Sequence, residues 1–215
     1  NRLETITYSG IMTNSSRRGR ISNNHIEDIK CSSGAGSGNG YGISMTRTSS
    51  TDLTQYPVCT DITVTGNTVR SVATWSGIDA HGGERLVVNS NTIFDTYYGI
   101  TIGGSHNVAA PQEVLVNSNV LCSNRTGTAA MGISFTGSST TIYSSGSING
   151  NIIENYGDQD TAISAAISLY QTRGLAVTGN TIINPSPTGI HVKYKNYGFT
   201  ITGNVVRDAW TTDGS

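Results

Sequence analysis

The chain repeats one short pattern of apolar and polar positions along its whole length. An apolar residue, two other positions, an asparagine, one further position and a second apolar residue recur seven times. The asparagines of this pattern are Asn24, Asn67, Asn91, Asn119, Asn151, Asn180 and Asn204. A second pattern, a small residue followed by isoleucine, alternates with the first, as at Gly42-Ile43 and Gly77-Ile78. Each repeat therefore carries both patterns in the same order.

Within each pattern the apolar residues alternate with polar ones, which is the period of a β-strand, and no window sustains the helical period of about 3.6 residues. The shortest repeat, from Gly77 to Gly99, is long enough for three short strands and three turns. Strands that recur in one direction pair in parallel with those of the previous coil, and parallel crossovers are right-handed. The sequence therefore predicts an all-β fold, a right-handed parallel β-helix of about seven rungs.

The recurrent asparagine has a structural interpretation. Its short amide tolerates a left-handed backbone and can bond the same turn of the next rung. Glycines directly before it, such as Gly66 and Gly150, ease the same corner. We expect the seven asparagines to stack in one column, as an asparagine ladder.

The length, charge and cysteine content of the chain limit the kinds of protein that it can be. The 215 residues correspond to a single β-helix domain over 1–215, which we expect to be a fragment of a longer chain. A formal net charge of -1 without a run of Lys or Arg argues against nucleic-acid partners. No apolar run has the length of a membrane-spanning segment, so we expect no membrane insertion. Cys31, Cys59 and Cys122 are too few and scattered for a disulfide framework. We expect free thiols, no metal site and no cofactor.

Candidate chemistry gathers in one segment, "SGIDAHGGERL" at 76–86. Charged residues make up only 13% of the chain, yet this segment holds Asp, His, Glu and Arg within seven positions. Ile78 belongs to the inward column, so Ala80 points inward as well, while Asp79 and His81 point outward onto one exposed face. The pattern favours a functional site at this pair, and the alternative is a solvated face without function. His25, on a different strand, is interpreted as structural or solvated.

The surroundings of this pair predict space for a ligand. The outward positions of the same strand in neighbouring rungs are short and neutral until the last rung, and they include Ser44, Thr46, Thr101, Gly103, Ser134 and Thr136. The connection that follows is short at 82–85 but longer in the rungs on both sides. A short loop between two tall ones predicts a groove for an elongated polymer. We expect Gly82 and Gly83 on its floor and, on its walls, Glu84, Arg85, His106 and Arg47.

The seven registered repeats resemble the pectate-lyase-like superfamily of β-helices across essentially the whole chain. Within it, the richness in Ser, Thr and Gly without calcium-binding clusters is most similar to the β-helical body of a bacteriophage tailspike. This resemblance implies a depolymerase of the virion tail, extracellular and homotrimeric, that binds and cleaves a bacterial surface polysaccharide, either capsule or lipopolysaccharide. An apolar strip that we expect to be exposed fits a trimer interface. It consists of Val120, Ile152, Ile183 and Val205.

A second resemblance concerns the chemistry. Asp79 and His81, with tyrosines in neighbouring rungs, resemble the Asp-Pro-His catalytic segment of alginate C-5 epimerases and related lyases, where Asp, His and a nearby Tyr act on a uronic acid. Ser76 stands where that tyrosine would be. The resemblance therefore implies that Tyr98, at the same register position in the next rung, substitutes for it.

Three functions remain open: a tailspike depolymerase, a secreted bacterial uronate lyase or C-5 epimerase, and a non-catalytic glycan-binding tail fibre. Hydrolysis would use two carboxylates, of which Asp79 and Glu84 are the nearby pair and Asp95 and Asp52 are more distant candidates. Elimination would use a base, an acid and a group that neutralises a uronate carboxylate. The residues for these three roles are His81, Tyr98 and either Arg47 or Arg85. We expect further substrate contacts at His106, Tyr170, His191 and Lys193.

Overall fold

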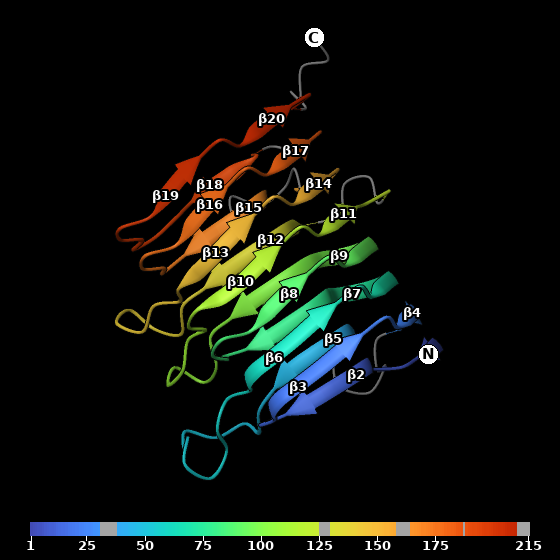
Figure 1. The fold of residues 1–215 in the computed structure, drawn as a ribbon, viewed down its shortest axis with the longest axis vertical. Helices are drawn as coiled ribbons and strands as arrows, with labels where there is room; N and C mark the ends of the chain where they lie inside the picture. The colour runs from blue at the N-terminus through green and yellow to red at the C-terminus, as the bar shows by residue number, and fades with distance from the viewer. Residues whose placement is uncertain (31–37, 125–129, 158–163, 187, 210–215) are drawn as a thin grey trace.

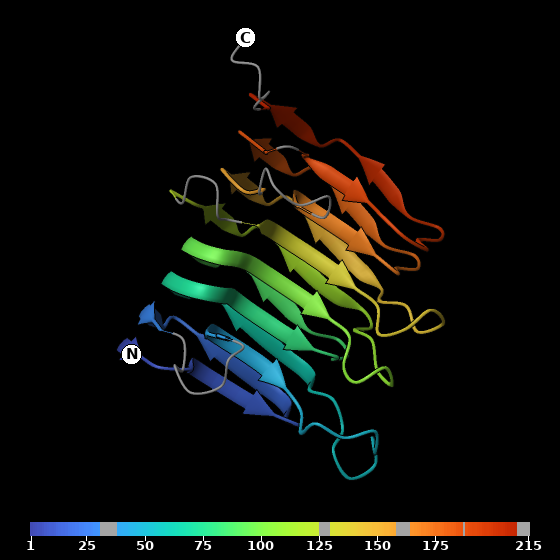
Figure 2. The same ribbon diagram turned by 180° about the vertical axis from the view of Figure 1, so that it is seen from behind.

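The structure, a computed structural model, describes residues 1–30, 38–124, 130–157, 164–186 and 188–209. It is a right-handed parallel β-helix of seven rungs, whose coil axis runs along the vertical direction of Figure 1. The fold predicted from the repeats is confirmed. Figure 2 shows the same stack from behind, with the first rungs at one end and the last at the other. Within the described residues, no helix has the length and apolar character needed to cross a membrane.

Each rung contributes strands to three faces of the coil. The first face is a seven-stranded parallel sheet of β3 (Arg17–Ser22), β6 (Thr60–Thr65), β8 (Val87–Asn89), β10 (Val114–Asn117), β13 (Gly146–Asn149), β16 (Ala176–Thr178) and β19 (Thr200–Thr202). The second face contains β1 (Arg2–Ile6), β4 (His25–Ile29), the first parts of β7 (Thr68–His81) and β9 (Thr92–Gly103), then β11 (Val120–Cys122), β14 (Ile152–Glu154), β17 (Thr181–Ile183) and β20 (Val205–Arg207). The third face contains β2 (Ser9–Asn14), β5 (Tyr41–Thr46), the second parts of β7 and β9, then β12 (Met131–Thr136), β15 (Ala165–Tyr170) and β18 (Ile190–Val192). Because β7 and β9 run through the corner between them, the second and third faces form one continuous sheet.

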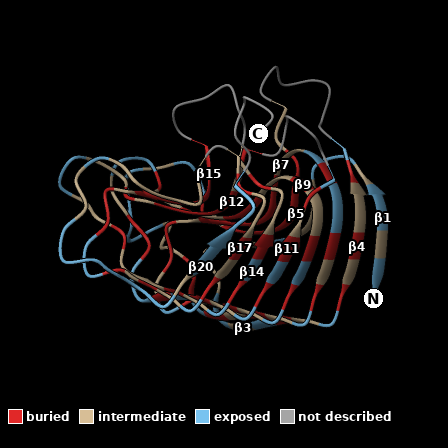
Figure 3. Ribbon diagram, turned by 90° about the horizontal axis from the view of Figure 1, so that it is seen from above, coloured by how far each residue is buried: buried red, intermediate tan, exposed pale blue. Residues whose placement is uncertain are grey.

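The core fills the inside of the coil, as Figure 3 shows in a view turned to look from above. On the third face, strand pairing stacks the isoleucines of successive rungs into an inward column, and those of the five middle rungs are buried: Ile43, Ile78, Ile100, Ile133 and Ile167. Burial of each such side chain contributes roughly 1.5–3 kcal/mol. The predicted alternation of inward and outward residues is therefore correct on this face.

The asparagine ladder lies at the corner between the first and second faces. Asn67 donates from its backbone N and from Nδ2 to Oδ1 of Asn91, both at 3.0 Å. The same pair of hydrogen bonds repeats from Asn24 to Asn204, and Asn1 adds one more side-chain bond at the start. The ladder satisfies buried polar groups that would otherwise destabilise the corner.

One detail of the ladder prediction is wrong. The left-handed backbone lies at the residue before each ladder asparagine, not at the asparagine, because that residue turns the chain and lets the following amide enter the corner. These residues have φ between 54° and 65°, and they are Asn23, Gly66, Ser90, Ser118, Gly150, Gly179 and Gly203. Glycine occupies four of the seven positions, as its freedom at positive φ predicts. Cys59 and Cys122 are free thiols, and Cys31 lies outside the described residues.

Candidate functional site

The second part of β7 brings Asp79 and His81 to the outer side of the third face. Strand pairing places Asp79 between Ser44 of β5 and Thr101 of β9, in the outward column that the sequence predicts. Nε2 of His81 lies 2.9 Å from Oδ2 of Asp79. The two side chains are therefore adjacent, as expected from their spacing on a strand.

The expected exposure of Asp79 is wrong. Its side chain is 1% exposed, whereas that of His81 is 38% exposed. Oδ1 accepts a hydrogen bond from Ser76 Oγ at 3.4 Å, and Ser76 Oγ lies 2.8 Å from Thr101 Oγ1. Because these neighbours are small, His81 lies against the carboxylate. Asp79 thus faces away from the coil interior and is still shielded from water.

The carboxylate changes the acid–base behaviour of His81. Hydrogen-bonding contact with Asp79 raises the pKa of His81 above its usual 6.5, burial lowers this pKa, and the negative charge of Asp79 raises it again, with a net increase. The short contact is imperfectly aligned, since Oδ2 accepts no hydrogen bond of ordinary geometry. As Nε2 contacts Asp79, Nδ1 is the ring nitrogen left for a ligand.

The aromatic neighbours of the pair differ from the expectation. Tyr98 meets Trp75 edge-on, with ring centroids 5.1 Å apart, whereas Tyr41 is the tyrosine beside His81, at 6.2 Å. Burial and, secondly, the charge of Asp79 raise the pKa of Tyr41, so its phenol stays protonated at neutral pH. Sequence reasoning counted Tyr41 among the tyrosines of the neighbouring rungs but assigned the role to Tyr98, and it missed Trp75. The signal for Tyr41 was present, because it occupies the register position of Ser76 in the preceding rung.

A cavity of about 290 Å³ opens beside the pair. Its wall carries three titratable side chains, Asp79, His81 and His106, together with the aromatic ring of Trp75. The rest of the lining is small and neutral: Ala80, Thr101, Gly103, Gly104, Asn107, Thr136, Gly137 and Ser138. The space predicted from short neighbours in the outward columns is therefore present, next to an imidazole.

The groove itself lies elsewhere than expected. At Gly82, a Cβ atom would stand 2.8 Å from Val58 and 3.5 Å from Ala109, because the loops on the two sides meet above this glycine. The floor predicted at Gly82 and Gly83 is consequently buried. The cavity lies in the next rung, where Gly103 contributes to its lining.

Arg47 holds one of these loops in place. Its Nε donates to the carbonyl oxygen of Tyr56 at 2.7 Å, and its two terminal nitrogens donate to those of Ser50 and Asp52 at 2.6 and 3.1 Å. A longer contact of 3.4 Å reaches Ser105 of the neighbouring loop. The guanidinium is buried, and its donors are used within the protein. Arg47 therefore stabilises the loop, and its guanidinium is not available to neutralise the carboxylate of a bound uronate.

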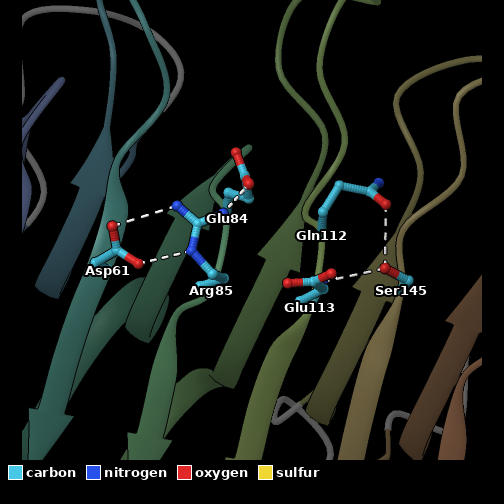
Figure 4. Close-up of polar contacts among 6 residues, drawn as sticks. All are labelled: Asp61, Glu84, Arg85, Gln112, Glu113 and Ser145. Carbon is cyan, nitrogen blue, oxygen red and sulfur yellow. Dashed lines mark hydrogen bonds and ion pairs between the residues drawn. The ribbon is translucent and has the colours of Figure 1, made fainter.

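Glu84 and Arg85 are engaged with each other at the corner that leads to the first face. Figure 4 shows Arg85 between Asp61 and Glu84, with Nε 2.7 Å from Asp61 Oδ1. Neither Glu84 nor Arg85 lines the cavity, where Asp79 is the single carboxylate among the described lining residues. The carboxylate pair expected for hydrolysis, Asp79 with Glu84, is therefore not brought together there.

The remaining expected contacts are distributed along the third face. His106 lines the cavity, and its Nδ1 lies 3.5 Å from Ser49 Oγ. Tyr170, at the end of β15, lies in the outward column of His81 three rungs further, and its ring stacks on another tyrosine. His191 and Lys193 belong to the last rung. The structure thus brings His106 to the cavity and leaves the other three outside it.

Metal ligands do not cluster in the described part of the chain. No three side chains of His, Cys, Asp or Glu come together there in an arrangement that could hold a metal ion. Cys59 is buried, with its Sγ 3.3 Å from the carbonyl oxygen of Thr46.

In a comparison with known protein families, residues 33–213 match the family model "NosD: Periplasmic copper-binding protein (NosD)". No curated protein matches the chain.

Proposed function

The chain belongs to the NosD family, and on that premise, together with the cavity at His81, we propose that it is a periplasmic or secreted β-helix protein that binds an acidic polysaccharide. The word "periplasmic" in the family description supports a location outside the cytoplasm. A groove on the side of a rigid solenoid suits an extended polymer, because successive rungs offer the same outward positions at a regular spacing.

Copper, which the family description names, is not part of this proposal. Copper sites in proteins use clustered imidazole and sulfur ligands. Among the described residues, no three His, Cys, Asp or Glu side chains are clustered in this way, and Nε2 of His81 contacts Asp79. The donor groups present here do not fit a copper centre, so no step of the proposed activity involves one.

One observation carries the proposal: the buried carboxylate of Asp79 lies behind an imidazole that faces a cavity. Such a carboxylate orients the ring and increases its basicity, which suits abstraction of a proton from a carbon atom. Trp75 offers an aromatic face for a sugar ring. His106 and Asn107, also in the lining, offer hydrogen bonds to a uronate carboxylate.

The proposed reaction is β-elimination at a uronate. His81 takes the proton from C5, the electron pair forms a C4–C5 double bond, and the bond from C4 to the glycosidic oxygen breaks. The leaving oxygen takes a proton from solvent, so the products are a new free hydroxyl end and an unsaturated uronate. Return of a proton to the opposite face of C5, without cleavage, would give epimerisation from the same first step. Hydrolysis is less well supported, because the cavity offers a single carboxylate among its described lining residues.

A second candidate function is non-catalytic glycan binding. One observation favours it: the described lining of the cavity contains no Lys or Arg. No fixed cation of that lining would therefore stabilise the negative charge that develops on the uronate during elimination. The two functions separate when polygalacturonate and alginate are incubated with the protein. Elimination gives products that absorb in the near ultraviolet. Epimerisation inverts the configuration at C5, which the NMR spectrum of the polymer reports. A binding module leaves both polymers unchanged. Failure to bind any acidic polysaccharide would contradict the proposal.

The finer expectations of a bacteriophage tailspike, a virion location and a homotrimer stay predictions that rest on resemblance. Val120, Ile152 and Val205 are exposed, as the proposed trimer interface requires, whereas Ile183 is half-buried. Sedimentation of the protein as a monomer would contradict that assembly.

A further inference from the structure

A second group of aromatic and cationic side chains lies at the corner that joins the third face to the first, in the last rungs. Tyr143 and Tyr197 meet edge-on, with centroids 5.4 Å apart. The guanidinium of Arg173 lies over both rings, 4.7 Å from the centroid of Tyr143 and 5.9 Å from that of Tyr197. Tyr143 and Arg173 also line a cavity of about 310 Å³. The group is thus next to a hollow of the surface.

A neighbouring pair of rings extends this group. Tyr170 stacks on Tyr194 with centroids 5.6 Å apart and planes at 29°. Nζ of Lys195 lies 5.1 Å from the centroid of Tyr194. Hydrogen bonding to Tyr194 is the main cause that raises the pKa of Lys195. Tyr194, Lys195 and Tyr197 lie in the same short connection between β18 and β19, so the two groups of rings adjoin. Tyr194 and Tyr197 are among the most exposed aromatic rings of the described chain.

The last rungs carry several cations in a stretch of sequence that lacks carboxylates. The sequence contains no Asp or Glu from Thr161 to Arg207, although Arg173, Lys193 and Lys195 lie in that stretch. Within the described residues, none of these three cations forms an ion pair with a carboxylate. Exposed aromatic rings beside cations without carboxylate partners are the groups that stack on sugar rings and attract their carboxylates.

One loop connects this cluster to the cavity at His81. From the end of β12 into its connection to β13, residues 136–138 line the first cavity, and residues 141–143 line the cavity that Arg173 also lines. Tyr170 lies three rungs beyond His81 in the same outward column, about 14 Å away at ~4.8 Å per rung. The two cavities therefore adjoin along the coil axis and follow the direction in which a polymer would extend.

We infer that Arg173 and Lys195, together with Tyr143, Tyr194 and Tyr197, form a second subsite for the acidic polysaccharide. This inference rests on the proposed function and deepens it: the polymer carries carboxylates, and it runs along the coil axis from His81 toward the last rung. A single-stranded nucleic acid would also stack on tyrosines, but such ligands require a strongly basic groove, and this chain has a formal net charge of -1.

The test compares a long ligand with a short one. Binding of polygalacturonate and of a galacturonate disaccharide is measured by calorimetry for the wild type, for the double variant Arg173→Gln, Lys195→Gln and for Tyr194→Ala, Tyr197→Ala. Lys30→Gln is the matched control, because Lys30 is exposed, pairs with Asp28 and lies in the first rungs. Dextran, which is neutral, controls for charge, and an oligothymidylate tests the nucleic-acid alternative.

We expect either double variant to bind polygalacturonate about tenfold more weakly and the disaccharide with unchanged affinity, because the disaccharide occupies the cavity at His81 alone. Equal polymer affinity in the double variants and the wild type would overturn the second subsite while leaving the proposed function intact. Tighter binding of oligothymidylate than of polygalacturonate would overturn it in favour of nucleic acid. A wild type that binds neither uronate probe would refute the proposed function, and the subsite with it.

Discussion

Two histidine–carboxylate pairs lie on the outside of the coil, and comparing them shows how a solvated ion pair differs from a candidate functional site. On β4, His25 Nε2 lies 3.1 Å from Glu27 Oε2, and on β7, His81 Nε2 lies 2.9 Å from Asp79 Oδ2. In both pairs the partners are two residues apart, and the histidines are equally exposed, at 37% and 38%. The carboxylates differ, because Glu27 is 34% exposed and Asp79 is 1% exposed.

The two pairs differ in how water reaches the carboxylate. At the exposed pair, the hydrogen bond from His25 lowers the pKa of Glu27, and water competes for both groups. At the buried pair, Asp79 raises the pKa of His81. A carboxylate that cannot exchange its partner for water acts on the imidazole beside it. The second pair also borders the cavity of about 290 Å³, which is why it is the candidate site.

The largest expected difference between the pairs is in activity. We expect His81→Ala to reduce the rate of polygalacturonate elimination by about 10²–10⁴-fold, the contribution of a positioned base. His25→Ala should leave the rate unchanged, since its side chain pairs with Glu27 outside the cavity. The measurement is the near-ultraviolet absorbance of unsaturated products. Equal rates in the two variants would remove the distinction between the pairs.

The second largest expected difference is in the free energy of unfolding when either carboxylate is removed. Asp79→Ala removes a buried acceptor from Ser76 and leaves a small void, so we expect a loss of about 1–3 kcal/mol in the free energy of unfolding. Glu27→Ala should change it far less, because water already competes for both groups of this exposed ion pair. Urea denaturation of both variants measures this. A loss in Glu27→Ala as large as in Asp79→Ala would show that burial is not the relevant difference.

A pH titration of His81 sharpens the electrostatic part of the comparison. In Asp79→Asn, the pKa of His81 should fall, because the negative charge is lost and burial then acts without its opposing contribution. In Glu27→Gln, the titration of His81 should be the same as in the wild type. Side-chain NMR of labelled histidine follows both. An unchanged titration in Asp79→Asn would mean that the carboxylate does not act on the ring.

The smallest expected effect is on how stability depends on pH, and the two pairs should act in different ranges. The pKa of His81 is raised in the folded state, so its contribution is complete below 6.5 and is lost as pH rises through the folded value. The pKa of Glu27 is lowered, so its contribution is present above 4.5 and is lost as pH falls through the folded value. Urea midpoints of His81→Gln and Glu27→Gln against the wild type test this. Loss of both contributions in one pH range would contradict the assignment.

The sequence predicted the repeat, the ladder and the outward position of Asp79 and His81, because each depends on the spacing of residues along a regular strand. It did not predict the burial of Asp79, which depends on side chains from neighbouring rungs. Nor did it predict that two loops close over Gly82, since loop conformation depends on contacts such as those of Arg47. Because Glu84 follows His81 closely in the sequence, it was predicted to lie beside the pair. In the structure, the chain turns a corner after β7, and Glu84 pairs with Arg85 instead.

The central claim is that an acidic sugar binds at His81. The chain has four histidines, so one spectrum with labelled histidine reports on every one of them during a titration with galacturonate disaccharide. His81 and His106 line the cavity and should shift together as the disaccharide binds, while His25 and His191 stay in place. Shifts at His25 as large as those at His81, or no shift at His81 while the disaccharide binds, would contradict the account.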